Sequence, residues 1–326
     1  MKKLSSVLLA SVLLISAFTA TGCSQKDSGL KLGLGVHTSV SATDADEDRD
    51  GQGQAVITAA AVLVDEDGKI VKAFIDCAEN QVGYTADGTA LTSDSFITKY
   101  EAGESYGMKA YGGAEKEWFE QADAFCEVIR DKTAAEVISL VSADSKGNDE
   151  VIRAGCTIKV DEFAKAVEKA MGNAVVSGAN KNDSVRLGFS TSQSTSDAAE
   201  DKDGTNKLET TLFAASVSAD GTITASSADS IEVTFTFDTD GVTTFDSESA
   251  VLTKKEQGDS YGMKAYGGAE KEWYEQADAF AASCIGKNIG EIDSLMGDNY
   301  RGNDEVQSAG CTIAVDGFIK AASKLR

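Results

Sequence analysis

The chain repeats itself, and this repeat constrains the fold more than any other feature of the sequence. The 14 residues of Ser105–Trp118 recur without change as Ser260–Trp273. From there the two copies align to the C-terminus without a gap, at an offset of 155 residues. A period of this length is far too long for a solenoid unit. We therefore expect a tandem duplication of a whole domain, with one fold present twice.

The N-terminal parts of the two copies have diverged more but still align. Leu32-Gly33 matches Leu187-Gly188, and the Asp-Gly steps at residues 67–68 and 87–88 recur at 220–221 and 240–241. The copies are separated near residues 172–183, where a Gly- and Asn-containing segment breaks the periodicity. We therefore predict a first domain at residues 30–175 and a second at residues 184–326.

Each copy has a strand-like first half and a helix-like second half. Ala55–Val64 and Lys69–Ile75 are apolar runs joined by an Asp-Gly turn, which is typical of a hairpin. Further on, apolar residues from Trp118 to Ile129 recur at helical spacing, Thr133 begins a capping box, and another helix starts at Asp161. Strands followed by helices predict an α+β fold: two tandem copies of one domain, each an antiparallel sheet with one buried face followed by two or three helices.

The N-terminus has the pattern of a secretory signal. A basic start precedes an apolar run at Leu4–Phe18, and small residues at 20–22 lead into Cys23, which resembles a bacterial lipoprotein box. We predict a signal peptide at residues 1–22, a lipid on Cys23 and a polar tether at residues 23–29. The mature protein is then expected outside the cytoplasm, anchored to the cell membrane through Cys23. The alternative is an ordinary signal peptide cleaved elsewhere.

Charge and histidine content exclude several functions. The chain has 30 Lys and Arg against 53 Asp and Glu, a net charge of -23, which disfavours nucleic acid as a partner. Its one histidine, His37, cannot supply a two-histidine metal site or a general base in both copies. We therefore predict a protein that is not an enzyme, with no catalytic residue and no metal. The acidic residues 46–51 match half of a calcium loop but lack its closing Glu.

The repeated 14-residue segment is the first candidate site. It contains Tyr106 and Lys109, followed by Gly112-Gly113, which are expected to open a helix. Paired glycines before a helix let backbone N–H groups approach an anion, and a planar ligand stacks on tyrosine. Tyr261 and Lys264 are the equivalents in the second copy. The alternative is that the aromatic residues belong to the core and the glycines only set a turn.

The second candidate is the segment Ala154–Ile158 with its copy Ala309–Ile313. Together with the hairpin-rich start and the Trp-containing helix, it resembles the FMN-binding domain family, and the mature chain is similar to surface lipoproteins of clostridial type. The family motif is Asp-x-x-Ser/Thr-Gly-Ala-Thr, whose Thr carries the FMN phosphate. The resemblance implies that Thr157 and Thr312 take this phosphate and that Gly155 and Gly310 let it approach closely.

The chain departs from this motif at several positions. Alanine replaces Ser/Thr at 154 and 309, cysteine replaces Ala at 156 and 311, and valine replaces Asp at 151 and 306. Covalent and noncovalent FMN binding both stay open, as does a buried strand with no ligand.

The remaining cysteines allow two interpretations. Besides Cys23 the chain has five, at positions 77, 126, 156, 284 and 311. Pairs between 126 and 156 and between 284 and 311 are conceivable outside the cytoplasm, and buried free thiols are equally compatible with the sequence.

The resemblance implies a flavoprotein in electron transfer. We expect a membrane-anchored lipoprotein with two FMN-binding-like domains that carries electrons to or from redox partner proteins. The alternative is a surface lipoprotein without a redox role that binds a ligand or another protein.

Overall fold

The computed structural model describes residues 29–93, 95–246 and 250–325. The predicted signal peptide at residues 1–22, the lipidation site Cys23 and all of the tether except Gly29 lie outside these ranges. In the described residues no helix is both long and apolar enough to cross a membrane.

Each repeat begins with three long antiparallel strands joined in sequence order. The first sheet contains β1 (Lys31–Thr43), β2 (Gly51–Val64), β3 (Ile70–Tyr84) and the short β4 (Val175–Val176), in the order β3-β2-β1-β4. The second contains β5 (Ser184–Ser196), β6 (Gly204–Val217) and β7 (Ile223–Phe237), in the order β5-β6-β7. The predicted hairpins around residues 65–68 and 220–221 are confirmed.

Helices follow the strands in both repeats, which confirms the predicted α+β class. The first repeat has α1 (Lys99–Ala102), η1 (Gly103–Tyr106), α2 (Trp118–Val128), α3 (Ala134–Ile138), α4 (Asp149–Ala154) and α5 (Asp161–Gly172). The second has α6 (Lys254–Gln257), η2 (Gly258–Tyr261), α7 (Trp273–Cys284), η3 (Ile289–Leu295), η4 (Asp298–Tyr300), α8 (Asp304–Ala309) and α9 (Asp316–Ser323). The three helices expected from residues 118, 133 and 161 are present, and the short α1 and α4 add to them.

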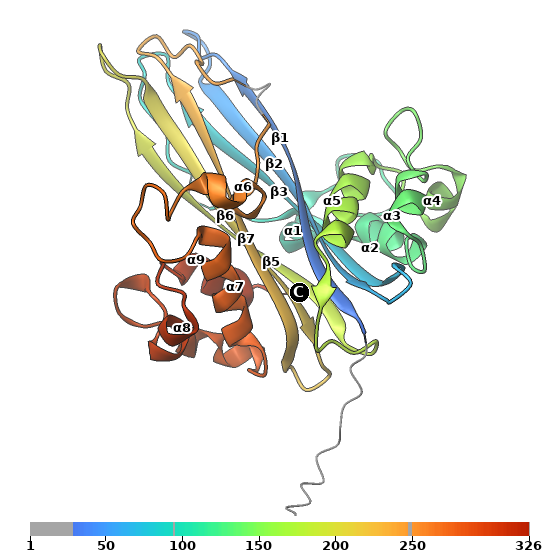
Figure 1. Cartoon of the computed structure of the whole chain (residues 1–326). Helices are drawn as coiled ribbons and strands as arrows, with labels where there is room; N and C mark the ends of the chain where they lie inside the picture. The colour runs from blue at the N-terminus through green and yellow to red at the C-terminus, as the bar shows by residue number, and fades with distance from the viewer. Residues whose placement is uncertain (1–28, 94, 247–249, 326) are drawn as a thin grey trace, which may run out of the picture.

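The two sheets pack face to face, and the helices cover their outer faces. Figure 1 shows the helices of the two repeats on opposite sides of the strands. Leu34 of β1 and Leu63 of β2 lie in one apolar core with Leu187 of β5 and Leu212 of β6. Each sheet therefore has two buried faces, where the sequence predicted one. The reason is that the partner sheet, rather than solvent, covers the second face.

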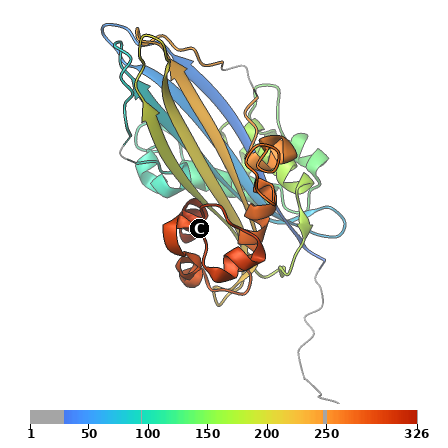
Figure 2. The same cartoon turned by 60° about the vertical axis from the view of Figure 1, so that its left-hand side comes forward.

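The strands extend past the helices at one end of the molecule, as Figure 2 shows. There Tyr84 of β3 stacks on Phe237 of β7, with ring centroids 4.3 Å apart. The packing of the two sheets thus continues beyond the part that helices cover.

Contacts between the repeats come in reciprocal pairs. The N–H of Ala45 donates to the carbonyl of Gly241, and the N–H of Ala198 donates to the carbonyl of Gly88, both at 2.8 Å. Lys169 pairs with Glu256 at 2.6 Å, and its equivalent Lys324 pairs with Glu101 at 3.3 Å. Ala45 and Ala198 are equivalent in the two repeats, as are Gly88 and Gly241, and Glu101 and Glu256. One chain therefore contains a two-fold interface of the kind found in symmetric dimers.

Glycines in β1 allow helix α5 to lie directly on the sheet. A Cβ on Gly35 would come within 2.2 Å of the carbonyl oxygen of Ala166, and a Cβ on Gly188 within 2.0 Å of that of Ala321. Since Ala166 and Ala321 are equivalent in the helical halves, Gly188 corresponds to Gly35. The sequence alignment that matched Leu32-Gly33 with Leu187-Gly188 is thus wrong by two residues in β1.

A substitution in the shared core tests whether the two repeats unfold together. Leu63→Ala removes a fully buried side chain between the sheets and should cost about 2–5 kcal/mol. The two tryptophans of the chain, Trp118 and Trp273, report one repeat each. In single-tryptophan variants (W118F or W273F), Leu63→Ala should lower the urea midpoint of both fluorescence signals equally. A shift seen only by Trp118 would contradict a shared core.

Asp76 predicts a dependence of stability on pH. Its Oδ1 accepts hydrogen bonds from the N–H of Cys77 at 2.7 Å and of Tyr100 at 3.1 Å, and burial raises its pKa from 3.8 to about 7. Between these values the folded state holds a proton that the unfolded state releases, so this carboxyl stabilises the fold at low pH and loses that contribution as the pH rises through 7. Compared with Asp76→Asn, the wild type should lose unfolding free energy between pH 5 and pH 8. If the difference in unfolding free energy between the wild type and Asp76→Asn were the same at pH 5 and pH 8, this prediction would be refuted.

Candidate functional site

The first repeat contains a cleft of about 500 Å³ on the outer face of its sheet. Its floor comes from β2 and β3, one wall from the segment between α1 and α2, and the other from the residues around the start of α5. The side chains that line it include Val56, Thr58, Cys77, Glu79, Lys99, Tyr106, Met108, Trp118, Ile158, Lys159, Glu162 and Phe163. The two candidate segments of the sequence therefore border the same cleft.

Lys99 places a cation in this cleft. Its Nζ lies 5.2 Å from the ring centroid of Tyr106, 5.9 Å from that of Trp118 and 3.4 Å from Oε2 of Glu79. Burial by itself lowers the pKa of Lys99, but the nearby Cys77, Tyr106 and Glu79 outweigh it and raise this pKa to about 12. Lys99 thus stays charged at neutral pH.

Of the predicted residues in the 14-residue segment, Tyr106 lines the cleft and Lys109 does not. The Nζ of Lys109 lies 3.8 Å from Glu120, with 47% of its side chain exposed, and Lys264 pairs in the same way with Glu275 at 3.3 Å. In each repeat the cation beside the tyrosine is instead a lysine of the preceding helix, Lys99 or Lys254.

The glycine pair does not open a helix, contrary to the sequence prediction. Gly112-Gly113 end a turn, and α2 begins only at Trp118. Two backbone amides earlier in the segment instead bind a carboxylate of the chain itself. Glu117, which is 3% exposed, accepts hydrogen bonds from the N–H of Met108 at 2.9 Å and of Lys109 at 3.1 Å. An internal anion therefore occupies this position.

Thr157 lies in the loop between α4 and α5, and its side chain is exposed. Its N–H and Oγ1 both donate to Oε1 of Gln121, at 2.8 and 3.1 Å, while Nε2 of Gln121 donates to the carbonyl of Lys116 at 3.1 Å. Gln121 therefore connects the loop of Thr157 to the repeated segment. The following residue, Ile158, lines the cleft, whereas Thr157 and Gly155 are not among the residues that line it.

Gly155 is required by the backbone in this loop. It ends α4 with a φ of +96°, and Gly310 ends α8 with a φ of +101°. A Cβ on Gly155 would also meet Nζ of Lys116, which donates to the carbonyl of Ala154 at 3.1 Å. The glycines thus cap a helix and accommodate a lysine side chain. Ala154 ends α4 and residues 155–158 form a loop, so the interpretation of this segment as a buried strand is wrong.

The second repeat has the same framework with a much smaller hollow. Thr312 donates to Oε1 of Gln276 as Thr157 does to Gln121, but the cavity that partly overlaps the equivalent place measures only about 170 Å³. Strand register places Glu209 where the first repeat has Val56. Nζ of Lys254 lies 2.6 Å from this carboxylate.

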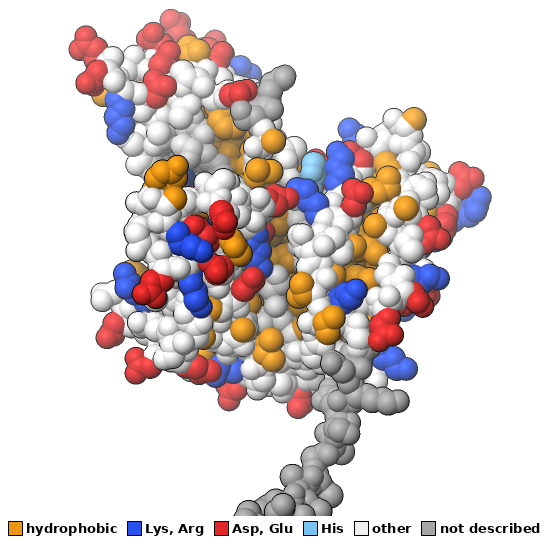
Figure 3. Space-filling view, viewed as in Figure 1, with side chains coloured by type: hydrophobic (Ala, Val, Ile, Leu, Met, Phe, Trp, Pro, Cys, Tyr) orange, Lys and Arg blue, Asp and Glu red, His pale blue; other side chains and the backbone are white. Residues whose placement is uncertain are grey.

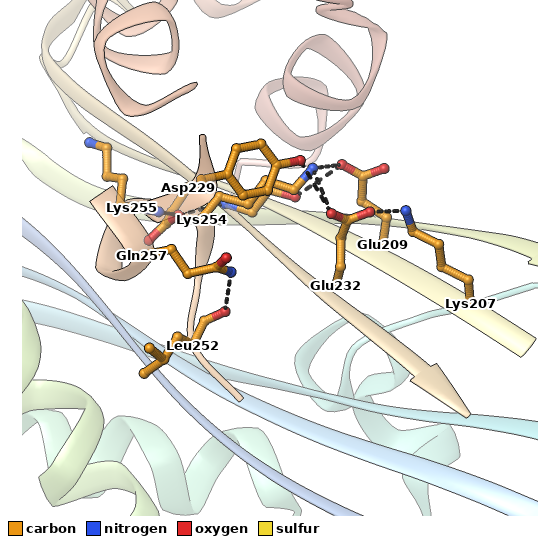
Figure 4. Close-up of polar contacts among 10 residues, drawn as sticks. Lys207, Glu209, Asp229, Glu232, Leu252, Lys254, Lys255 and Gln257 are labelled. Atoms are coloured by element: carbon orange, nitrogen blue, oxygen red, sulfur yellow. Dashed lines mark hydrogen bonds and ion pairs between the residues drawn. The ribbon is translucent and has the colours of Figure 1, made fainter. Parts of the chain in front are cut away.

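Figure 4 shows how the charges of the second repeat are arranged. Lys254 extends between the carboxylates of Glu209 and Glu232, at 2.6 and 3.4 Å, and Lys207 also pairs with Glu232. Lys254 and Glu232 correspond to Lys99 and Glu79, so the additional partners are Glu209 and Lys207. These charges occupy the polar part of the site in the second repeat.

The five cysteines of the described part of the chain are free thiols, at positions 77, 126, 156, 284 and 311. Burial raises the pKa of Cys77 and of Cys284 to about 12, and that of Cys156 and of Cys311 to about 11. These groups are protonated at neutral pH. Among the described residues no group of three His, Cys, Asp or Glu side chains is placed to hold a metal ion, and Asp46 of the acidic loop pairs with Arg49.

Lys99 and Gln121 are the important residues of the site that the sequence analysis did not single out. A signal for both was present, because Thr98-Lys99 recurs as Thr253-Lys254 and Gln121 recurs as Gln276 at the same offset as the repeated segment. Their role was not evident because it depends on contacts with residues distant in sequence.

Part of the chain is similar to a protein of Desulfitobacterium hafniense named chlorophenol reductase, with 36% identity over 94 residues. The match covers 25% of this chain and 29% of the reductase, so the chain spans less than a third of that relative's length. No family model matches the chain, and no solved structure matches it.

Removing the internal carboxylate tests the description of the loop. Glu117→Ala leaves two backbone N–H groups without their acceptor and should cost about 1–3 kcal/mol for each group left unsatisfied. Sulfate should then stabilise the variant in thermal unfolding, because it can take the place of the carboxylate, with little effect on the wild type. Glu272→Ala is the matched change in the second repeat and should behave alike. Equal responses of the wild type and both variants to sulfate would contradict this account.

Proposed function

We propose that the protein is a lipid-anchored, extracytoplasmic electron carrier that holds FMN in the cleft of its first repeat. The observation that carries the proposal is this cleft of about 500 Å³, bordered by both candidate segments, of which the one at Ala154–Ile158 resembles part of the FMN-binding domain family. The partial similarity to a protein named as a reductase also favours a redox role. In this proposal Cys23 carries the lipid, and the redox partners are other proteins at the cell surface.

The residues of the cleft fit the chemistry of FMN. Val56, Tyr106, Met108 and Ile158 provide apolar and aromatic surface for a flat ring system. Glu79 and Glu162 are acceptors for the hydroxyl groups of the ribityl chain, and Lys99 and Lys159 are cations for the phosphate. Thr157, the exposed neighbour of the lining residue Ile158 in the sequence, would offer the hydroxyl that a phosphoester needs. The bound flavin would supply the electron-carrying chemistry.

The proposal places the flavin in the first repeat rather than in both. The equivalent space of the second repeat is smaller, and Glu209 adds a carboxylate to it. Thr312, Gly310 and Tyr261 would then keep the shared framework without holding a cofactor. The described residues offer no nucleophile paired with a histidine base, and we propose a carrier rather than an enzyme.

Exchanging one residue between the repeats tests the proposal. The wild type, produced with its native secretion machinery, should show the visible absorbance of flavin at about one flavin per chain. Val56→Glu should remove it, because the new carboxylate enters the cleft and pairs with Lys99 as Glu209 pairs with Lys254. The reverse change Glu209→Val should retain the flavin.

Intact mass of the same samples gives the mode of attachment. A covalent flavin should disappear from Thr157→Ala and remain in Thr312→Ala, and the mass also reports lipid on Cys23. A colourless wild type, or flavin that survives Val56→Glu in a folded protein, would refute the flavin site in the first repeat.

A second candidate function rests on the exposed part of the repeated segment. Tyr111 and Tyr266 are each 91% exposed, on loops of identical sequence. Two exposed tyrosines in the same setting favour a protein-interaction or ligand-binding lipoprotein without a redox role. A colourless protein would favour this function over the first.

A further inference from the structure

A separate cavity of about 450 Å³ lies between the two repeats. The first repeat contributes Leu34 of β1 and Val175 of β4, and the second contributes residues of β7, α6 and α7, among them Ser227, Lys255 and Ile285. Figure 3 shows hydrophobic side chains in the hollow between the helices of the two repeats. This inter-repeat cavity shares no residue with the cleft of the first repeat.

The equivalent place in the first repeat is filled by aromatic rings. Phe74 of β3 pairs with Ala61, and its centroid lies 4.8 Å from that of Tyr100, which in turn lies 5.7 Å from Phe119. Ser227 of β7 pairs with Ala214, the residue equivalent to Ala61, and so stands where the first repeat has Phe74.

The second repeat differs from the first at two more positions around the inter-repeat cavity. Lys255 stands in the place of Tyr100, and Tyr274 in that of Phe119, and both line the inter-repeat cavity. The register of β7 on β6 matches that of β3 on β2, so Ser227 lies at the position of Phe74 in the sheet. The cavity therefore includes the space that Phe74 occupies in the first repeat.

The chemistry of the lining selects among occupants. Leu34, Val175 and Ile285 present apolar surface, and Nζ of Lys255 lies 2.5 Å from Asp278 and 3.5 Å from Oγ of Ser227. A neutral aromatic ring would cover the apolar surface and offer its face to the ammonium group of Lys255.

An anionic guest is disfavoured, because Lys255, the one cation among the lining residues, is already paired with Asp278. Asp229 is buried in its wall, and Glu256 and Asp278 also line it, against the single cation Lys255 among the lining residues and the nearby Lys169, which pairs with Glu256.

We propose that the inter-repeat cavity binds a small, neutral, single-ring aromatic compound, whose ring takes the place that Phe74 fills in the first repeat. This site is independent of the flavin cleft, and its ligand need not be redox-active.

Toluene, which has the shape of the phenylalanine side chain, is the probe for this site. Saturation-transfer NMR should show protein signal on toluene with the wild type and with Ser227→Ala, which keeps the space. Ser227→Phe restores the ring of the first repeat and should reduce the signal at least tenfold. Ala282 lies at an exposed position of α7 and also lines the inter-repeat cavity. Ala282→Trp should therefore reduce the toluene signal too, and it replaces Ser227→Phe as the test if that variant does not fold.

Two controls separate this site from the flavin cleft. Val56→Glu should leave the toluene signal unchanged, whereas Phe74→Ser should open an equivalent site in the first repeat and increase it. Absence of signal with the wild type, or an equal signal in folded Ser227→Phe and Ala282→Trp variants, would overturn the proposal.

Discussion

The packing of one sheet on the other is the interaction on which the rest of the structure depends. Each sheet is apolar on both faces, and Leu34 and Leu63 of the first share a core with Leu187 and Leu212 of the second. A single repeat would expose that apolar face to water, at a cost that grows with its area. The duplication removes this cost within one chain, and reciprocal bonds such as those of Ala45 and Ala198 fix the orientation.

Because the shared core holds both sheets in place, the outer faces are free to differ. The first repeat keeps an open cleft above Val56 and fills the place of Phe74 with aromatic rings. The second does the reverse, with Glu209 and Lys254 across the cleft and Ser227 beside an open cavity. The two halves therefore present different chemistry on one framework. One fold can carry different sites on the same framework.

The identity of the repeated segment has a partly structural reason. Glu117 holds the N–H groups of Met108 and Lys109, and Gln121 connects this segment to the loop of Thr157. A change in any of these would leave a buried polar group without a partner, which is costly. This reason does not extend to Tyr111, whose side chain is 91% exposed.

The sequence alone determined the duplication, the α+β class and the main hairpins and helices, because turn residues, capping boxes and apolar spacing act over a few residues. It placed the glycine pair at 112–113 before a helix wrongly, because the N–H of Gly112 donates to the carbonyl of Met108 in a turn and α2 begins only at Trp118. Tertiary structure decided that both faces of each sheet are buried. It also decided that two identical segments border unlike cavities, since that difference comes from strand residues such as Val56 and Glu209, which are far away in the sequence.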